Sequence, residues 1–402
     1  MKRAACTIIS LNYLPYARTL CESFLQFHPD CRFYVLLVDS LPASIDLRNE
    51  AFELVLVEDL SIPCFESVAF KYDILELNTN VKPTFLKVLL DRGIDEVVYL
   101  DPDILIYRDL TPVFDALAES SIVLTPHALS PTPGDGRSEL LHLVSGVFNL
   151  GFVAVRACAE TGRFLSWWEE RCLNIAYNEP RAGMFVDQKW INLAPCYFDG
   201  VNVLKHQGCN MAYWNLHERL LSIEKEEYIV NGTCPLIFFH FSGISVDGGK
   251  RISKYTEMFT LENRPDLRLL FENYRERLIQ HGIRDQRVVE YSFGAFDNGQ
   301  MINRLTRSIY AANIERFAGE DPFCSSSRFY AWAKDKRFIS SVSDSAKAYT
   351  SKSYSKTDTR IRLVHATLRL ALRIFGADRY TVLMKYLSYV SILTNQCDVF
   401  ED

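Results

Sequence analysis

Short, largely apolar runs alternate with segments of helical periodicity along the N-terminal part of the chain. The apolar runs have the length of β-strands and lie at 4–11, 33–38, 53–58 and 97–100. Apolar residues recur at helical spacing between them, in the segments at 15–25, 66–77 and 83–93. Strands without polar alternation, joined by helices, are typical of a parallel sheet covered on both faces. The pattern therefore predicts an α/β fold with a mostly parallel sheet flanked by helices.

The pattern changes along the rest of the chain. Further apolar runs lie at 121–127, 148–156 and 236–243, and the sequence from Pro265 onward is mainly helical in pattern. The stretch 340–359 is polar and rich in serine, which is typical of a linker or loop. We therefore expect an α/β domain over 1–264, a helical or irregular extension packed on it over 265–339, a linker over 340–359 and a helical tail over 360–402.

Composition narrows the class of protein. The 402 residues are 48% hydrophobic and carry a net charge of −6, and this negative charge argues against a nucleic-acid partner. The 11 cysteines are odd in number and contain no C-x-x-C pair, which argues against a disulfide framework and a zinc site. The N-terminus lacks a signal-peptide cleavage site, and no segment has the apolar length of a transmembrane helix. These features predict a cytoplasmic protein.

Two carboxylates follow the buried strand predicted at 97–100. Asp101 and Asp103 flank Pro102, which fixes the backbone between them. Neighbouring carboxylates repel each other, so we expect a positive group beside them, and Mg²⁺ or Mn²⁺ suits such ligands. The alternative is a surface turn, for which Asp and Pro are common residues. The apolar residues at 104–106 favour the cation site.

A third cation ligand should come from elsewhere in the chain. His240 ends the apolar run at 236–239 and is followed by Ser242 and Gly243. An imidazole beside two carboxylates favours Mn²⁺ over Mg²⁺. The alternative interpretation is a histidine that serves only the packing of the core.

Five short motifs occur in order along the first two thirds of the chain. They are TIISLNY at 7–13, YLDPD at 99–103, FNLG at 148–151, DQ at 187–188 and HFSG at 240–243. This series resembles that of the nucleotide-sugar glycosyltransferases of the GT-A fold, nearest to the retaining family 8 type. The resemblance implies a GT-A-like, Rossmann-type catalytic domain that transfers a sugar from a nucleoside-diphosphate sugar, with UDP the expected nucleotide, to a saccharide or lipid-linked saccharide. It also implies retention of configuration and a setting in bacterial surface-glycan synthesis.

The resemblance implies roles for individual residues. Asp103 and His240 would hold the cation, and Asp101 would face both the cation and the ribose. The nucleotide sugar would be bound by Asn12, Tyr13, Lys82, Asp101, Gly151 and Lys254. Asn149, Asp187 and Gln188 would bind the sugar hydroxyls or lie beside the anomeric carbon.

Some of these assignments have alternatives. The family's Lys-Pro-Trp after H-x-x-G is missing, so the diphosphate contact could come from Lys250, Arg251 or Lys254, of which Lys254 is favoured. Lys82 is the basic residue nearest to the family's arginine, and it could equally be a solvated lysine at a helix start. Asp187 could be a helix N-cap or, in an inverting enzyme, the base that activates the acceptor.

The C-terminal third offers two weaker signals. The aromatic stretch 291–332 could form a lid or acceptor platform, with packing as the alternative. Arg362, Arg369 and Arg373 recur at helical spacing and predict a basic amphipathic helix over 360–376. Such a helix could lie on the inner face of an anionic membrane. The alternative is a helix packed on the domain with its arginines in water.

Two other functions compete with a glycosyltransferase. A non-catalytic nucleotide- or glycan-binding relative is disfavoured because both carboxylates, the histidine and the DQ pair are present. A phosphatase of the haloacid dehalogenase type also ends a strand in D-x-D, but those enzymes need Thr or Val where this chain has Leu105. Their motif also lies near the start of the chain, whereas here the second Asp is residue 103.

Overall fold

The described residues fall into two compact units. The computed structural model describes residues 1–134, 136–284, 290–339, 359–392 and 395–396. Unit 1 consists of Met1–Phe65 and Ile74–Ser292, and unit 2 of Glu66–Asp73 and Phe293–Asp402. The linker expected over 340–359 lies outside the described residues, apart from Thr359.

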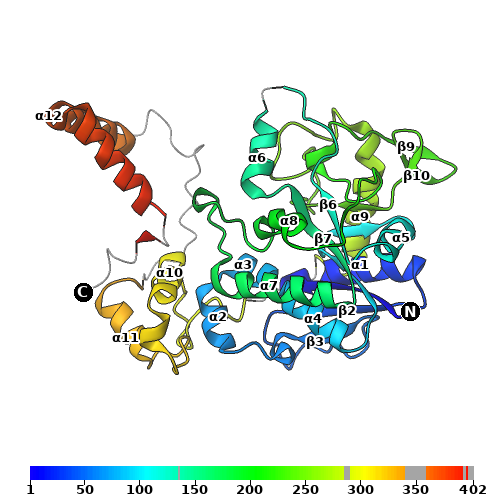
Figure 1. Ribbon diagram of the computed structural model, residues 1–402, viewed down its shortest axis with the longest axis horizontal. Coiled ribbons are helices and arrows are strands. Elements are labelled where there is room, and N and C mark those ends of the chain that lie inside the picture. The colour runs from blue at the N-terminus through cyan, green and yellow to red at the C-terminus, as the bar shows by residue number, and fades with distance from the viewer. Residues whose placement is uncertain (135, 285–289, 340–358, 393–394, 397–402) are drawn as a thin grey trace. The chain divides into compact units, whose positions relative to one another are not determined.

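Unit 1 is built on a seven-stranded sheet in the order β3-β2-β1-β4-β7-β6-β8. The strands in this order are Glu53–Leu56, Arg32–Leu37, Arg3–Ile9, Glu96–Leu100, Phe148–Arg156, Ile122–Pro126 and Val201–Val203. Neighbouring strands are parallel, except that β7 is antiparallel to both β4 and β6. The mostly parallel sheet that the sequence predicts is therefore confirmed (Figure 1).

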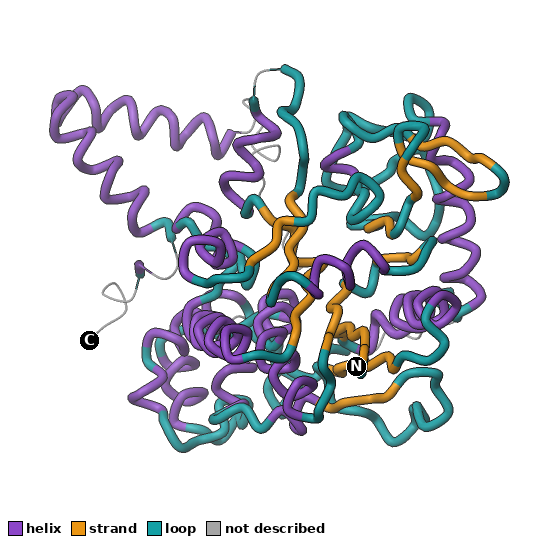
Figure 2. The backbone as a smooth tube through the Cα atoms, turned by 45° about the vertical axis from the view of Figure 1, so that its right-hand side comes forward, coloured by secondary structure: helices purple, strands orange, loops and turns teal. Residues whose placement is uncertain are grey.

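Helices cover both faces of this sheet (Figure 2). Ala5, Val35 and Val98 face one side and form a common core with Phe24 of α1 and Val113 of α5. The helices α3 and α4 contact β1 and β4, and α7 packs on α4. The helices of unit 1 are α1 (Leu14–Phe27), α3 (Ile74–Asn80), α4 (Lys82–Asp91), α5 (Thr111–Ala118), α6 (Arg137–Ser145), α7 (Ala159–Ile175), α8 (Ala194–Tyr197) and α9 (Arg268–Gln280).

Five smaller strands complete unit 1. β5 (Ile104–Ile106) pairs with β12 (Phe238–His240), apart from the main sheet. β9 (Leu221–Glu224), β10 (Glu227–Val230) and β11 (Cys234–Pro235) form a separate three-stranded sheet.

The helical segment predicted at 66–77 is divided in the structure. The structure has two helices there, α2 (Phe65–Lys71) and α3 (Ile74–Asn80). The boundary between the two units falls in the gap between them, after Asp73. Apolar periodicity does not reveal this break, because both helices bury apolar residues and the gap residue Tyr72 is itself fully buried.

Unit 2 has an aromatic core around α2. Phe70 packs against Phe296, Tyr310 and Phe329. The helices α10 (Arg304–Ala312) and α11 (Arg328–Asp335) also contribute to this core. The guanidinium of Arg307 is buried and donates to the carbonyls that end α2, including that of Phe70 at 2.7 Å. These contacts favour packing over acceptor binding for this part of 291–332.

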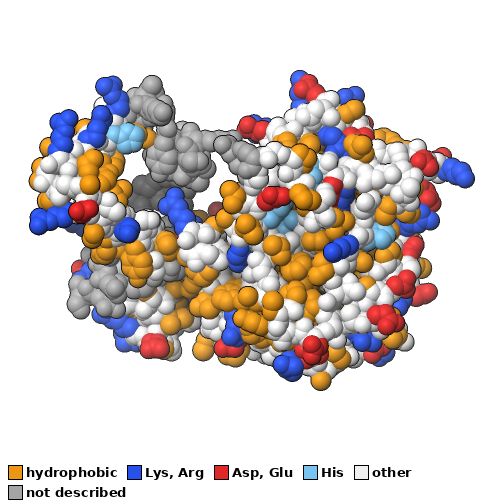
Figure 3. Space-filling model, turned by 45° about the horizontal axis from the view of Figure 1, so that its top comes forward, with side chains coloured by type: hydrophobic (Ala, Val, Ile, Leu, Met, Phe, Trp, Pro, Cys, Tyr) orange, Lys and Arg blue, Asp and Glu red, His pale blue; other side chains and the backbone are white. Residues whose placement is uncertain are grey.

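The C-terminal helix α12 (Thr359–Val390) breaks at Gly376, where φ is 74° and ψ is 170°. None of its described side chains is buried, and basic and hydrophobic side chains lie together on its surface (Figure 3). Among the described residues, no helix has both the length and the apolar character needed to cross a membrane.

Candidate functional site

Strand pairing brings the two carboxylates and the histidine together. After β4 ends at Leu100, the chain turns through 101–103 into β5. The antiparallel register of β5 and β12 places Ile104 opposite His240. The amide of Phe241 also donates to the carbonyl of Asp103 at 2.8 Å. His240 must therefore lie beside Asp103, although 137 positions of sequence separate them.

The three side chains form a compact donor set. Nε2 of His240 lies 2.9 Å from Oδ1 of Asp103 and 3.8 Å from Oδ2 of Asp101. One donor atom of each residue lies within 4.8 Å of the others, and the described residues contain no second such group of three. Two carboxylate oxygens and an imidazole nitrogen suit Mn²⁺ or a similar divalent cation. The residues present therefore fit the cation that the sequence predicts.

A hydrogen bond fixes the orientation of the imidazole. Nδ1 of His240 lies 3.2 Å from Oδ1 of Asn149, and Asn210 donates to the same oxygen at 3.0 Å. Because Nδ1 carries the proton toward Asn149, Nε2 can offer its lone pair to a cation. Burial acts to lower the pKa of His240, but Asp103 and Asp101 outweigh it, so the pKa is raised.

Gly151 makes room for this imidazole. A β-carbon at position 151 would lie 2.4 Å from Cε1 of His240 and 2.9 Å from Oδ1 of Asn149. Contacts that short are sterically forbidden, so only glycine allows the ring to occupy its position. Gly151 thus contributes to the site through its missing side chain.

Lys82 and Asp187 form a buried ion pair beneath the site. Nζ of Lys82 lies 2.7 Å from Oδ2 of Asp187 and donates to the carbonyl of Leu150 at 2.8 Å. Both side chains are 2% exposed. Burial raises the pKa of Asp187, while Lys82 opposes that shift. The structure therefore rules out the alternative that Lys82 is a solvated lysine. The partner of the Asp187 carboxylate is the Lys82 ammonium, in place of the backbone amides that a helix N-cap would bind.

Gln188 joins two parts of the backbone. Its Oε1 accepts from the amide of Leu150 at 3.0 Å, and its Nε2 donates to the carbonyl of Ser145 at 2.9 Å. The side-chain amide thereby connects the end of α6 to β7. It is 7% exposed.

A cavity of about 350 Å³ opens beside the candidate cation ligands Asp101, Asp103 and His240. It is lined by Ile8, Ile9, Ser10, Asn12, Tyr13, Tyr16, Ile74, Leu75, Asn78, Thr79, Tyr99, Asp101, Pro102, Asp103, His240, Ser242, Gly243, Ile244, Lys254 and Tyr255. The predicted residues Asn12, Tyr13, Asp101, Asp103, His240 and Lys254 are therefore brought together. Lys82, Asn149, Gly151, Asp187 and Gln188 do not line it.

Lys254 is the basic residue of its segment that reaches the cavity. Lys250 pairs with Glu262, and Arg251 lies 3.6 Å from Glu257. Gly243 lets the segment return to the site: its φ is 73°, and a β-carbon there would lie 2.8 Å from Ser253 and Tyr255.

Sequence reasoning missed the contribution of α3. Four of its residues line the cavity: Ile74, Leu75, Asn78 and Thr79. Nδ2 of Asn78 donates to Oγ of Ser10 at 2.8 Å, which ties α3 to the end of β1. The polar pair Asn78-Thr79 on an otherwise apolar helical face was the available signal.

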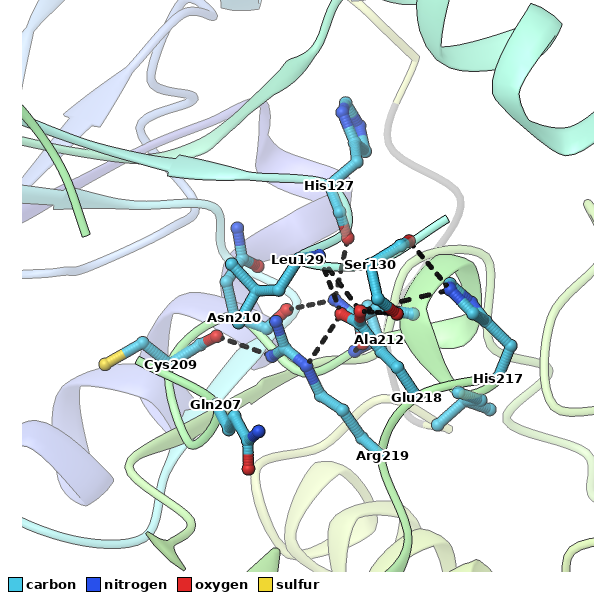
Figure 4. A network of polar contacts seen from close by, with 12 residues as sticks. His127, Leu129, Ser130, Gln207, Cys209, Asn210, Ala212, His217, Glu218 and Arg219 are labelled. Carbon is cyan, nitrogen blue, oxygen red and sulfur yellow. Dashed lines mark hydrogen bonds and ion pairs between the residues drawn. The ribbon is translucent and has the colours of Figure 1, made fainter. Parts of the chain in front are cut away.

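A polar network surrounds Asn210 (Figure 4). The carboxylate of Glu218 accepts from the amide of Leu129 and the hydroxyl of Ser130. Asn215 donates at 3.0 Å to the carbonyls of both His127 and Asn210. The network fixes the backbone of Asn210, whose side chain in turn holds Asn149. Asn210 was not predicted from the sequence.

Comparisons with known proteins give a family match. Residues 66–235 match the model of the nucleotide-diphospho-sugar transferase family. Two uncharacterized proteins of Bacillus subtilis (strain 168) are similar to the chain. YfnF is 28% identical over 304 residues, covering 74% of this chain and 98% of its own length. YfnD is 24% identical over 275 residues, covering 67% of this chain and 86% of its own length.

Solved structures of glycosyltransferases are also similar. LgtC, a galactosyltransferase solved with donor and acceptor sugar analogs, is 16% identical, covers 71% of this chain and 97% of its own, and has a TM-score of 0.38. GlyE of Streptococcus pneumoniae TIGR4 is 17% identical, with coverages of 74% and 67% and a TM-score of 0.40. The family match supports a glycosyltransferase, as the sequence predicts.

Proposed function

We propose that this chain is a cation-dependent glycosyltransferase of the retaining, family 8 type, which transfers a sugar from a UDP-sugar to a saccharide or lipid-linked saccharide. The observation that carries the proposal is the cluster of Asp101, Asp103 and His240 at the edge of a cavity of about 350 Å³. Mn²⁺ is the preferred cation because an imidazole completes the donor set.

The chemistry of the cluster accounts for departure of the nucleoside diphosphate. A bound cation would supply positive charge for the two phosphates as the bond to the sugar breaks. Asp101, Asp103 and His240 would hold it, and Lys254 would provide a second positive charge for the diphosphate. The ammonium of Lys254 lies at the cavity wall, 5.0 Å from the ring centre of Tyr255.

Other residues that line the cavity suit a base and a ribose. Tyr13 is 39% exposed and stacks on Tyr16 with a ring separation of 4.8 Å, which offers a flat apolar surface to a nucleobase. Asn12 and the α3 residues Asn78 and Thr79 offer amide and hydroxyl groups that can bind a uracil and ribose hydroxyls.

The sugar-binding roles of Lys82, Asn149, Gly151, Asp187 and Gln188 stay predictions. Polar atoms of Lys82, Asn149, Asp187 and Gln188 already contact other protein groups, so direct sugar binding by these side chains requires those contacts to rearrange or to be shared. Retention of configuration is part of the proposal, and the anomeric proton of the product, read by NMR, tests it.

The acceptor side of the proposal involves α12. This helix carries six Lys or Arg residues and one Asp. Apolar residues such as Leu370 and Phe375 are at least half exposed. A basic, apolar surface of this kind favours peripheral contact with an anionic membrane, where a lipid-linked acceptor of bacterial surface-glycan synthesis would be found on the cytoplasmic side.

A binding screen tests the proposed function. Nucleotides and sugar nucleotides are added with and without Mn²⁺ to the wild type and to Asp103→Ala, and the melting temperature is measured. Because a ligand that binds only the folded state stabilises it, we expect stabilisation by uridine nucleotides that requires Mn²⁺ and disappears in the variant. The same responses in both proteins would contradict the cation site. Sugar transfer or release in a turnover assay separates an enzyme from a binding protein.

A further inference from the structure

Tyr99 makes a short hydrogen bond to one of the candidate cation ligands. Its hydroxyl donates to Oδ1 of Asp101 at 2.6 Å, and the residue is 2% exposed. A phenol is protonated at neutral pH, so the Tyr99 hydroxyl is the donor. The Asp101 carboxylate is thereby divided, with Oδ1 bound to Tyr99 and Oδ2 turned toward His240 at 3.8 Å.

Without this hydroxyl, the Asp101 carboxylate has more freedom. The side chain is 30% exposed, so water can reach it. Rotation about the bond to the carboxylate is broad and roughly two-fold in energy, so a hydrogen bond to one oxygen selects an orientation. Groups that hold a metal ligand in this way set its orientation and basicity.

Tyr99 is itself held by the buried ion pair. Nζ of Lys82 lies 4.3 Å from the centre of the Tyr99 ring, within the range of a cation–π contact. Asp187 and the carbonyl of Leu150 fix that ammonium in place. On the backbone, Tyr99 pairs with Val153 of β7, which prevents the ring from shifting along the strand.

We propose that Tyr99 is a positioning residue that orients Asp101 toward a divalent cation, and that the Lys82–Asp187 pair fixes Tyr99 in that position. The inference rests on the cation site of the proposed function. It gives the buried pair a role that requires no contact with substrate, and it connects the pair to the cation through one aromatic ring.

The test compares Tyr99→Phe with Tyr107→Phe. Phenylalanine keeps the ring and its contact with Lys82 but removes the hydroxyl. Tyr107 also belongs to unit 1, and its buried hydroxyl has no hydrogen-bond partner among the described residues. We expect Tyr99→Phe to weaken Mn²⁺ binding roughly 10-fold in calorimetry, within the range for such supporting groups. Tyr107→Phe should bind as the wild type does.

A double-mutant cycle shows whether Tyr99→Phe weakens Mn²⁺ binding through Asp101 or through a general loss of stability. If Tyr99 acts through Asp101, then adding Tyr99→Phe to Asp101→Ala, which has no acceptor for the Tyr99 hydroxyl, should cause little further loss of Mn²⁺ affinity. Losses that add fully would mean that Tyr99 only supports packing, and they would overturn the inference. So would unchanged Mn²⁺ affinity in Tyr99→Phe.

Failure of the inference can be told apart from failure of the proposed function. If the wild type binds Mn²⁺ and Asp103→Ala does not, the cation site stands, and an unchanged Tyr99→Phe overturns only the role of Tyr99. If the wild type binds no Mn²⁺ with or without nucleotide, both fail. The electron paramagnetic resonance spectrum of bound Mn²⁺ adds a second readout, which we expect to change in Tyr99→Phe and not in Tyr107→Phe.

Discussion

Lys82 and Asp187 are 105 residues apart in the chain, and their charged groups meet at 2.7 Å in the interior of unit 1. Lys82 begins α4, and Asp187 precedes a short 3-10 helix at Lys189–Leu193. Lys82 also donates to the carbonyl of Leu150, which lies between the predicted site residues Asn149 and Gly151 of β7. Because a buried charge without its partner is destabilising, Lys82 and Asp187 can stabilise this part of unit 1 only when both are present.

Removing one partner of the pair should be costly. Lys82→Met leaves the Asp187 carboxylate buried without its cation, and we expect the free energy of unfolding to fall by about 3–5 kcal/mol. Replacing both residues, as in Lys82→Met with Asp187→Leu, should recover much of this loss. Urea denaturation of the three variants measures the effect.

A second lysine of α4 provides the control for that experiment. Lys87 pairs with Glu169 but is 33% exposed, so Lys87→Met should cost about 1 kcal/mol or less. Equal losses for Lys82→Met and Lys87→Met would contradict the role assigned to the buried pair.

Gly151→Ala should abolish cation binding without unfolding the protein. The added β-carbon would lie 2.4 Å from His240, so the imidazole must move away from Asp103. Gly162 lies inside α7 with no atom within 4 Å of an added β-carbon, so Gly162→Ala should be neutral or stabilising by up to about 1 kcal/mol. Calorimetry with Mn²⁺ and thermal melting measure both variants, and normal binding by Gly151→Ala would refute the steric argument.

The sequence predicted the sheet because buried parallel strands are apolar at successive positions, as in 97–100. It also predicted Asp101, Asp103 and His240, because each ends or follows such a strand. Their proximity depends on the pairing of β5 with β12. This is a long-range contact, which the local hydrophobic pattern of each strand does not predict.

Other features left no periodic signal in the sequence. The burial of Lys82 depends on Asp187 and on the packing of α4 against α7. The role of Asn210 depends on a left-handed backbone with φ of 55° and on a network formed by distant segments. Such residues look like ordinary surface lysines and turn asparagines until the fold places them.

Asn149 should influence cation binding through His240. Asn149→Leu removes the acceptor for Nδ1 of the imidazole, and we expect Mn²⁺ affinity to fall roughly 10-fold to 100-fold. Asn149→Asp keeps an acceptor oxygen at the same place and should retain more of the affinity. Calorimetry on both variants measures the difference, and a leucine variant that binds as tightly as the wild type would disprove the role of this hydrogen bond.

His127 should make the protein sensitive to mild acid. The residue is 6% exposed and its ring packs on His142 and Trp214. Burial lowers the pKa of His127 to about 3. Below about pH 6.5, the pKa of histidine in the unfolded chain, His127 is protonated in the unfolded state but stays neutral in the folded state. The free energy of unfolding therefore falls as the pH decreases. The loss attributable to this residue at pH 5 is about 2 kcal/mol.

The variant His127→Phe isolates that effect. Phenylalanine keeps a buried flat ring and cannot be protonated, so the decrease in stability between pH 6.5 and 5 should become smaller. His365→Phe, on the exposed surface of α12, should leave the decrease as it is in the wild type. Urea denaturation at several pH values compares the three proteins, and identical pH profiles for wild type and His127→Phe would rule out this source of acid sensitivity.

The proposed membrane contact of α12 can be tested by removing charge. Arg362, Arg369 and Arg373 lie on one side of its first half, each exposed. A basic residue near an anionic surface contributes about 1 kcal/mol, so the triple change to alanine should weaken binding to anionic phosphatidylglycerol vesicles roughly 100-fold. Sedimentation with vesicles measures it, and neutral phosphatidylcholine vesicles should bind both proteins weakly. Arg48→Ala, an exposed change in unit 1, is the control. An electrostatic membrane contact would be excluded if the wild type bound neutral and anionic vesicles equally. It would also be excluded if the wild type and the triple variant bound anionic vesicles equally.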